Sequence, residues 1–450
     1  SRPIVLNVGA TTEPTGMDPA TDTGAGTPFA LLYNVYETLV KIDSSGDIVP
    51  LLATGWNESE DGLTYTFTLQ PKATFASGAP LNAEAVKTSL ERIVNDDSVI
   101  ATLKSQLGSM ESVAAQDDST VVVKLSQRDN NWLYYAAQTA GIIYEPDRLD
   151  QLDTAPAGSG PFVFDSWSEG NPMVLRRNDS YWGTPTVFDS VTIKYFSDPN
   201  AENSAMSSGD LDVISNVQAP QSISQFQGTD QYTILNGTTM GEVVLGFNHQ
   251  REAFSDVRVR QAMNYAFDQK AYAEVLYSGF ANPATSVLPE KLHSYEAQTP
   301  YDVDLDKAKS LLKEAGYPDG FKLTLWGDNS TQETKGMTFV MQQMAQIGIT
   351  VDVQPMEPAT VADKTALPAD TELQMWYVNW SQNDADGFLR SLLSSGMVPP
   401  TGYNTAFWKD NEFDANLEKG NAAPTQDEQD KYYRECQKIA WENCPWLFLA

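Results

Sequence analysis

Residues 43–81 read DSSGDIVPLLATGWNESEDGLTYTFTLQPKATFASGAPL, and the pattern inside this stretch decides the fold class. Leu63, Tyr65, Phe67 and Leu69 alternate with threonines, which is the two-residue period of a half-buried strand. Asp61-Gly62 before them is typical of a tight turn. After Pro80, Asn82 is suited to cap a helix, because the apolar residues that follow fall on one helical face: Val86, Leu90, Ile93 and Val94.

The same alternation of strands and helices continues along the chain and predicts an α/β fold. The clearest unit spans 321–353, where a helical stripe of Met337, Val340, Met341, Met344 and Ile347 separates two strand patterns. This order predicts a parallel strand-helix-strand crossover, with the methionines in the core. Eight strands are expected at residues 4–8, 121–125, 191–196, 211–214, 243–248, 321–326, 349–353 and 375–378.

Length and charge limit what the protein does. A chain of 450 residues exceeds what one hydrophobic core usually serves, so two or three lobes are expected. The formal net charge of -31 argues against nucleic acid and anionic membranes as partners, since both are bound through clustered Lys and Arg. No apolar run approaches the ~20 residues of a membrane-spanning helix. The opening residues 1–4 (SRPI) show no secretion signal.

Cysteine and histidine are scarce. Cys436 and Cys444 lie eight residues apart, on and just beyond a predicted helix, and this spacing is too long for a relaxed disulfide. We therefore expect two structural thiols. With His249 and His293 as the only histidines, a His-rich metal site cannot be built and a Ser-His-Asp arrangement has few candidates. We predict no catalytic residue, no metal site and no cofactor.

A series of short motifs resembles one protein family. Beyond residues 43–81, the chain carries VYETLV at 35–40, GSGPFVF at 158–164, NDSYWG at 178–183, MSSGDLDVI at 206–214, FSDVRVRQAMNYAFD at 254–268 and YDVDLDKAKSLLKEAGYPDGF at 301–321. Their order along almost the whole chain is similar to the peptide/opine/nickel class (family 5) of extracellular solute-binding proteins, which serve ATP-driven importers. Five further motifs are most similar to glutathione-binding members: LWG at 325–327, NWS at 379–381, PPT at 399–401, NTAFW at 404–408 and AWENCPW at 440–446.

The resemblance implies a two-lobed periplasmic-binding-protein-like fold (class II, cluster C type) with a hinge and an extra small subdomain. Residues 1–43 plus 156–241 would form lobe I, to be completed by a C-terminal segment beyond residue 450. Residues 44–155 would form the extra subdomain, and 242–450 would form lobe II. The implied partners are a small peptide and a transmembrane permease. The protein is expected to be monomeric and extracytoplasmic, either periplasmic or lipid-anchored at the outer face of the cell membrane.

The loop that follows the strand at 375–378 is the leading site candidate, because open α/β sheets bind ligands beyond the carboxyl ends of their strands. It supplies Trp380, Ser381, Asn383, Asp384 and Asp386. In peptide-binding relatives this loop carries an aspartate for the ligand's α-amino group. Asn383 takes that place here, which fits a γ-linked or otherwise atypical peptide better. Asp384 and Asp386 would bind an ammonium group or, equally, cap the helix that follows.

Five other residues are expected near the ligand, and two competing functions stay open. Met17, Thr239, Trp326, Tyr403 and Asn404 complete the predicted site. No arginine is marked as a carboxylate clamp; Arg258 and Arg260 are expected to face solvent or to pair with acids. Within the same fold, the ligand would alternatively be a di- or oligopeptide or an oligosaccharide. Outside it, the rival is a glycoside or peptide hydrolase that uses a carboxylate pair.

Overall fold

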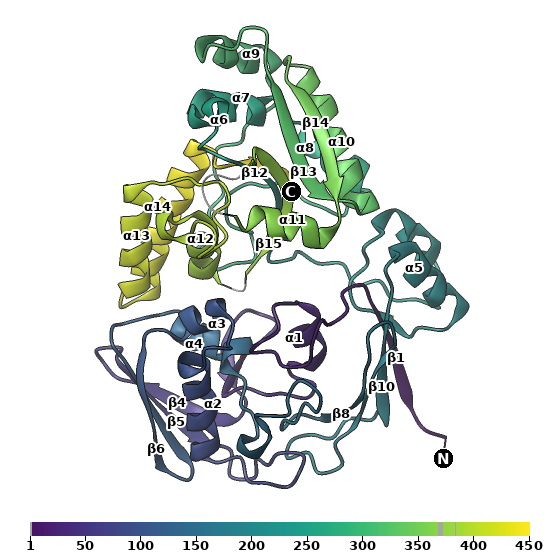
Figure 1. The fold of residues 1–450 in the computed structure, drawn as a ribbon, viewed down its shortest axis with the longest axis vertical. Coiled ribbons are helices and arrows are strands. Elements are labelled where there is room, and N and C mark those ends of the chain that lie inside the picture. The colour runs from purple at the N-terminus through teal and green to yellow at the C-terminus, as the bar shows by residue number, and fades with distance from the viewer. Residues whose placement is uncertain (1, 368–371, 383) are drawn as a thin grey trace. The chain divides into compact units, whose positions relative to one another are not determined.

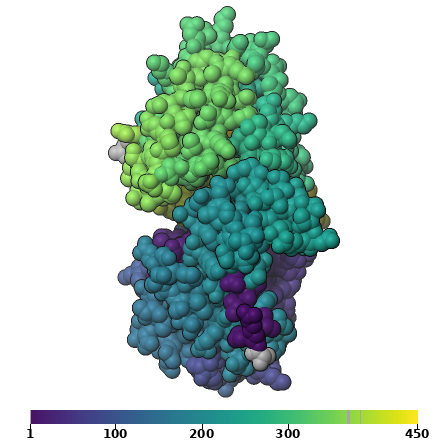
Figure 2. All heavy atoms as spheres, turned by 90° about the vertical axis from the view of Figure 1, so that its right-hand side faces the viewer, coloured from purple at the N-terminus to yellow at the C-terminus, as the bar shows by residue number. Residues whose placement is uncertain are grey.

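The computed structural model describes residues 2–367, 372–382 and 384–450. The chain divides into two compact units, Ser1–Ser222 (unit 1) and Ile223–Ala450 (unit 2). Each contains both strands and helices, so the α/β class predicted from the sequence is confirmed (Figure 1). Residues 2–5 are exposed, and Figure 2 shows this end of the chain on the surface of unit 1.

Unit 1 contains three sheets. A five-stranded sheet has the order β11-β1-β10-β9-β8, a four-stranded sheet has the order β4-β5-β7-β6, and β2 pairs with β3. The strands are β1 (Val5–Ala10), β2 (Val40–Ile42), β3 (Ile48–Pro50), β4 (Ala53–Glu58), β5 (Thr64–Leu69), β6 (Met110–Asp117), β7 (Thr120–Leu125), β8 (Phe162–Ser166), β9 (Met173–Arg177), β10 (Ser190–Tyr195) and β11 (Val213–Ile214). The helices are α1 (Gly26–Leu31), α2 (Ala83–Asn95), α3 (Ala101–Gln106), α4 (Trp132–Ala136) and α5 (Pro199–Ser208).

Strand β5 and helix α2 form within residues 43–95 as the sequence pattern predicts. Tyr65, Phe67 and Leu69 of β5 are buried, while the threonines between them are more exposed. Gly62 adopts a positive φ of 70° in the turn that precedes β5, a conformation that glycine reaches without strain. Asn82 caps α2, because its side-chain oxygen accepts a hydrogen bond of 3.0 Å from the amide of Ala85.

Unit 2 is built on one mixed sheet with the order β14-β13-β15-β12-β16. Its strands are β12 (Gly241–Phe247), β13 (Lys322–Asp328), β14 (Thr350–Met356), β15 (Met375–Ser381) and β16 (Trp446–Phe448). Its helices are α6 (Glu252–Ser255), α7 (Val257–Ala266), α8 (Gln269–Tyr277), α9 (Leu305–Glu314), α10 (Thr331–Ala345), α11 (Pro358–Thr365), α12 (Ala385–Leu393), α13 (Asn411–Ala422) and α14 (Gln426–Asn443). β13 and β14 are parallel and are joined by α10, which confirms the predicted crossover.

The two faces of this sheet bury two separate hydrophobic cores. Successive strand residues point to opposite faces, so Leu245 of β12 and Tyr377 of β15 enter one core, which also holds the methionines of α10. Val244 and Val378, one position along each strand, enter the other core, which contains residues of α12, α13 and α14. Figure 1 shows these three helices grouped together and α10 alongside β13 and β14.

Candidate functional site

A row of aromatic side chains follows one face of the unit 2 sheet to its edge. Trp376 and Trp380 are four residues apart on β15 and therefore share a face. Their ring centroids are 5.6 Å apart, and the Trp380 ring lies 5.9 Å from that of Tyr403, which is 45% exposed. Trp326 of β13 pairs in register with Trp376. We call these four residues the aromatic row; it brings together three predicted site residues, Trp326, Trp380 and Tyr403.

The inner end of the aromatic row is closed to solvent. Trp326 is buried in the same core as Trp376, and the ammonium group of Lys364 lies 4.7 Å from the centroid of its ring. Such an arrangement is an attractive cation–π contact. Exposure rises along the row from Trp326 through the half-buried Trp380 to Tyr403. A ligand that touches the row without rearrangement would therefore meet Tyr403 and Trp380.

Two further predicted residues lie at the edge of the sheet where the row ends. Ser381 is the last residue of β15 and pairs in register with Gly241, the first residue of β12. Thr239 stands just before β12, and its hydroxyl accepts a hydrogen bond of 3.3 Å from the Gly241 amide. Both Ser381 and Thr239 are exposed. Asn383 lies outside the residues that the structure describes.

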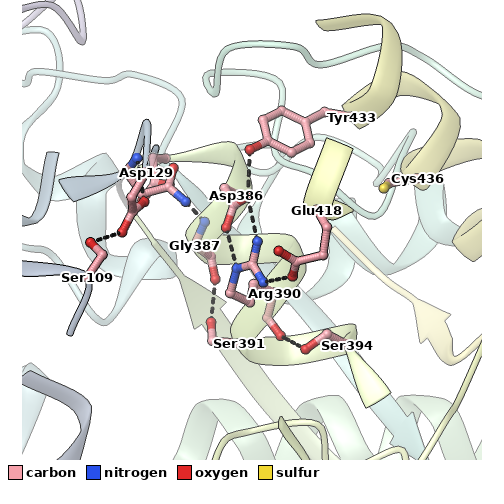
Figure 3. A network of polar contacts seen from close by, with 12 residues as sticks. Ser109, Asp129, Asp386, Gly387, Arg390, Ser391, Ser394, Glu418, Tyr433 and Cys436 are labelled. Carbon is pink, nitrogen blue, oxygen red and sulfur yellow. Dashed lines mark hydrogen bonds and ion pairs between the residues drawn. The ribbon is translucent and has the colours of Figure 1, made fainter. Parts of the chain in front are cut away.

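The two aspartates of the loop have partners within unit 2. Asp384 is the N-cap of α12 and accepts a hydrogen bond of 2.8 Å from the Gly387 amide. The fully buried side chain of Asp386 accepts hydrogen bonds from Arg390 at 2.7 and 3.2 Å and from the Tyr433 hydroxyl at 2.5 Å (Figure 3). Arg390 also pairs with Glu418. These contacts hold α12 against α13 and α14, and ligand binding by either aspartate stays a prediction.

We call Asp386, Arg390, Glu418 and Tyr433 the acid network. Burial and the contacts within it shift the pKa values of Tyr433 and Arg390. Burial and the neighbouring Asp386 carboxylate raise the pKa of Tyr433 well above its ordinary value. Burial alone would lower the pKa of Arg390, but its carboxylate partners, Asp386 first, raise it overall. The guanidinium is therefore charged, and the Asp386 and Glu418 carboxylates beside it compensate the cost of its partial burial.

Asn404 serves the loop that carries Tyr403. Its buried side-chain amide donates hydrogen bonds to the carbonyl oxygens of Ser394 (3.0 Å) and Trp408 (2.8 Å). Its own backbone amide donates to the Met397 carbonyl at 2.8 Å. These bonds fix the backbone next to Tyr403, so Asn404 positions Tyr403.

Met17 belongs to unit 1, unlike the other described residues of the predicted site. It is buried in the unit 1 core, and its amide donates a hydrogen bond of 3.1 Å to Asp153. The adjacent Asp18 fixes the turn by accepting a hydrogen bond of 3.0 Å from the Ala20 amide, and it pairs with Arg92 at 2.6 Å. Asp18, Arg92 and Asp153 also line a pocket of about 420 Å³ in this unit.

Sequence reasoning missed two residues of this region, Trp376 and Glu242. Trp376 lies within the predicted strand 375–378. The structure extends this strand to Ser381, and its two-residue period then places Trp376 and Trp380 on one face. Glu242 pairs in register with Trp380 and is 4% exposed. Its signal is a single carboxylate at the start of an otherwise apolar run, VVLGF at 243–247. A glutamate is rarely buried without a partner.

The expectation for Arg260 was wrong, whereas those for Arg258 and the cysteines were correct. Arg258 pairs with Asp256 at 2.7 Å. Arg260 is buried and donates to the backbone carbonyl oxygens of Phe254 (2.6 Å), Asn443 and Cys444. The helical period of α7 places it inward, so it holds the end of α14 and does not face solvent. Cys436 and Cys444 are free, buried thiols.

The chain belongs to family 5 of the bacterial extracellular solute-binding proteins, whose family model (Bacterial extracellular solute-binding proteins, family 5 Middle) matches residues 47–398. The family predicted from the ordered motifs is confirmed, and with it the functional class, a substrate-binding protein of ABC importers. Its relatives are binding proteins and not enzymes. Within the described ranges, no helix is both long and apolar enough to cross a bilayer.

Three similar proteins illustrate the ligands of the family. The glutathione-binding protein GsiB of Salmonella typhi is 31% identical over 94% of this chain and 84% of its own length. The periplasmic binding protein DppA of Helicobacter pylori, solved with the peptide STSA, superposes with a TM-score of 0.89 at 28% identity, over 99% of this chain and 92% of its own. AgaA from A.tumefacien R10, solved with agropinic acid, gives a TM-score of 0.83 at 27% identity, over 99% of this chain and 91% of its own.

Proposed function

We propose that this protein captures a small peptide, glutathione or a similar short or atypical peptide, and delivers it unaltered to the permease of an ABC importer. The observation that carries the proposal is the 31% identity to a glutathione-binding protein over 94% of the chain. The peptide complex of the structurally similar DppA supports the same class of ligand. Glutathione is a γ-linked peptide, in keeping with Asn383 at the loop position where peptide-binding relatives carry an aspartate.

The ligand would lie at the exposed end of the aromatic row in unit 2. Trp380 and Tyr403 offer flat apolar faces for its side chains, while Ser381 and Thr239 offer hydroxyl groups at the adjacent sheet edge. Asp384, Asp386, Trp326, Asn404 and Met17 remain part of the proposed site, directly or by positioning these residues. Binding by a few convergent polar groups on an apolar wall is typical of small-molecule sites.

Capture would involve two lobes and a hinge. We assign residues 1–43 plus 156–241 to lobe I, 44–155 to an extra subdomain and 242–450 to lobe II. The sheet β4-β5-β7-β6, made entirely within 53–125, supports the separate subdomain. A ligand that contacts both lobes stabilises the closed state by its differential affinity. The protein would act as a monomer outside the cytoplasm, in the periplasm or on a lipid anchor at the outer face of the membrane.

A thermal-shift panel tests the proposal. The panel contains reduced and oxidised glutathione, dipeptides, longer peptides, agropinic acid and cello-oligosaccharides. A true ligand at ~100 times its Kd adds about 2.7 kcal/mol to the free energy of unfolding. Stabilisation by glutathione supports the proposal, and a response to ordinary dipeptides alone discards the glutathione assignment. A response to the saccharides alone overturns peptide binding, and cleavage products detected by mass spectrometry after incubation would make the protein a hydrolase.

A further inference from the structure

Glu242 is a buried carboxyl group that lacks a counter-charge. It is the second residue of β12, and its Oε2 has no hydrogen-bond partner in the part of the chain that the structure describes. Burial raises the pKa of this carboxyl group well above its ordinary value, and no neighbouring charge contributes to the shift. A buried carboxyl oxygen without a partner costs folding free energy. Glu202 of unit 1 carries the same cost, so the case for a role of Glu242 depends on its surroundings.

The surroundings of Glu242 are the aromatic row. Because directly opposite residues of antiparallel strands share a face, the Glu242 side chain lies on the same face as its register partner Trp380 and as Trp376. The row continues from Trp380 to the exposed Tyr403. The faces of tryptophan and tyrosine rings attract cations. A buried acid opposite Trp380, whose ring adjoins that of Tyr403, is a combination that favours a positively charged ligand group.

The other acids near this sheet edge are already engaged. Asp384 caps α12, and Asp386 is held by Arg390 and Tyr433. On the described strands beside Glu242, the ionisable Tyr377 of β15 enters the opposite core, and β16 carries no ionisable side chain. Of these three described acids, Glu242 is therefore the one for which the structure shows neither a helix cap nor an ion pair.

We propose that Glu242 binds the primary ammonium group of the ligand, with the rings of Trp380 and Tyr403 beside it. The inference rests on the proposed function and deepens it, since it names the residue that selects peptides with a free amino group. The bond would be a charge-assisted hydrogen bond between the ammonium donor and the Glu242 carboxylate, which is stronger than a neutral one. When the carboxyl is protonated beforehand, binding releases its proton to solvent.

Calorimetric titration with four probes tests the assignment. The probes are reduced glutathione, alanyl-alanine and the counterpart of each in which hydrogen replaces the ammonium group. For the wild-type protein, we expect each peptide that binds to bind about 10- to 100-fold more tightly than its counterpart, which is the ratio that one hydrogen bond to a charged group supplies. The substitution Glu242→Gln keeps the shape of the side chain and should remove this preference.

Glu202→Gln is the matched control. Glu202 lies on α5 of unit 1, is fully buried and has no hydrogen-bond partner on either carboxylate oxygen among the described residues. Removing its charge should leave the preference of the wild-type protein unchanged. If a variant misfolds, a measurement on the wild type alone still tests the assignment. The preference for the peptide over its counterpart without the ammonium group should shrink as pH falls, because protonation of Glu242 competes with binding of the ammonium group.

The outcomes separate the two claims. If the wild-type protein binds a peptide and Glu242→Gln retains the same preference for the ammonium group, the assignment of Glu242 is overturned and the proposed function stands. The assignment also fails if both Glu242→Gln and Glu202→Gln lose the preference equally. If the wild-type protein binds neither glutathione nor alanyl-alanine, the proposed function fails, and the assignment fails with it.

Discussion

Two buried glutamates, one in each unit, differ in what the fold provides for them. Glu37 of unit 1 is 2% exposed and accepts hydrogen bonds from Ser159 (2.9 Å), Trp182 (2.7 Å) and Tyr181 (2.7 Å). Glu242 of unit 2 is 4% exposed, and its Oε2 has no such partner in the described ranges. Burial raises the pKa of both, but the three donors oppose that rise only at Glu37. Glu37 therefore acquires its donors from the chain, whereas the proposed partner of Glu242 is the ligand.

The largest loss of stability is expected from replacing Glu37, the glutamate whose carboxylate accepts three hydrogen bonds. Glu37→Leu leaves three donors without their acceptor, one of them in the fully buried Ser159. We expect the free energy of unfolding to fall by about 3 kcal/mol, because unsatisfied buried donors cost about 1–3 kcal/mol each and the half-buried ones regain water. Urea unfolding measures the change. A loss below about 0.5 kcal/mol would contradict the view that the donors of Glu37 stabilise the fold, since ordinary surface substitutions cause losses of that size.

A smaller loss of stability is expected from changing Asp386 in the acid network of unit 2. Like Glu37, and unlike Glu242, Asp386 has hydrogen-bond donors on both carboxylate oxygens. Asp386→Asn removes the charge that faces Arg390 but leaves Glu418 in place. We expect a loss of about 2 kcal/mol in the free energy of unfolding, below the 3–5 kcal/mol of a fully broken buried ion pair. Asp414→Asn is the control on neighbouring α13. Native stability combined with lost peptide affinity would instead make Asp386 a ligand contact.

At Glu242 the expected stability change has the opposite sign and depends on pH. The folded-state pKa is raised above that of the unfolded chain, so the folded protein holds the proton more tightly. Its stability contribution is complete below the unfolded pKa of about 4.5 and is lost as pH rises toward the folded pKa, by up to about 1.4 kcal/mol per pH unit. Glu242→Gln should therefore gain stability over the unliganded wild type from pH 5 upward, as measured by urea unfolding. Parallel pH profiles for the two proteins would contradict this.

A polar side chain whose partner lies close in the sequence should matter least. Asn82→Ala removes the cap of α2, a hydrogen bond that the Asn82 side chain accepts from the amide of Ala85, three residues later. We expect a loss of about 1 kcal/mol in the free energy of unfolding, the typical value for a helix cap. Asn82→Asp retains a capping oxygen and should stay near the wild-type value. Equal losses for both variants would show that the amide group has another role.

The range of the interactions explains how much could be predicted from the sequence. The β5 strand, the α2 cap and the β13-α10-β14 crossover follow from patterns within about forty residues, and the structure contains all three. The burial of Arg260 against α14, the contact of Asp386 with Tyr433 of α14 and the pair of Arg390 with Glu418 of α13 arise between distant segments. Local charge and spacing therefore predicted that Arg260 faces solvent or pairs with acids, and they could not predict the contact between Asp386 and Tyr433.

The candidate site follows the same division. Trp380 and Ser381 were predicted because they follow a recognisable strand, and Tyr403 was one of the other residues expected near the ligand. Glu242 was not predicted, since its position beside Trp380 depends on the antiparallel pairing of strands more than 130 residues apart. A single acid within an apolar strand pattern is a usable signal, but only the pairing shows which residues surround it.

Proton release on binding tests the central claim most directly. Titration calorimetry of glutathione at about pH 6, in buffers with different ionisation enthalpies, measures how many protons leave the protein for each ligand bound. If Glu242 receives the ammonium group, the wild-type protein releases up to about one proton and Glu242→Gln releases correspondingly fewer. Equal proton release by both proteins, at undiminished affinity in the variant, would contradict the role given to Glu242.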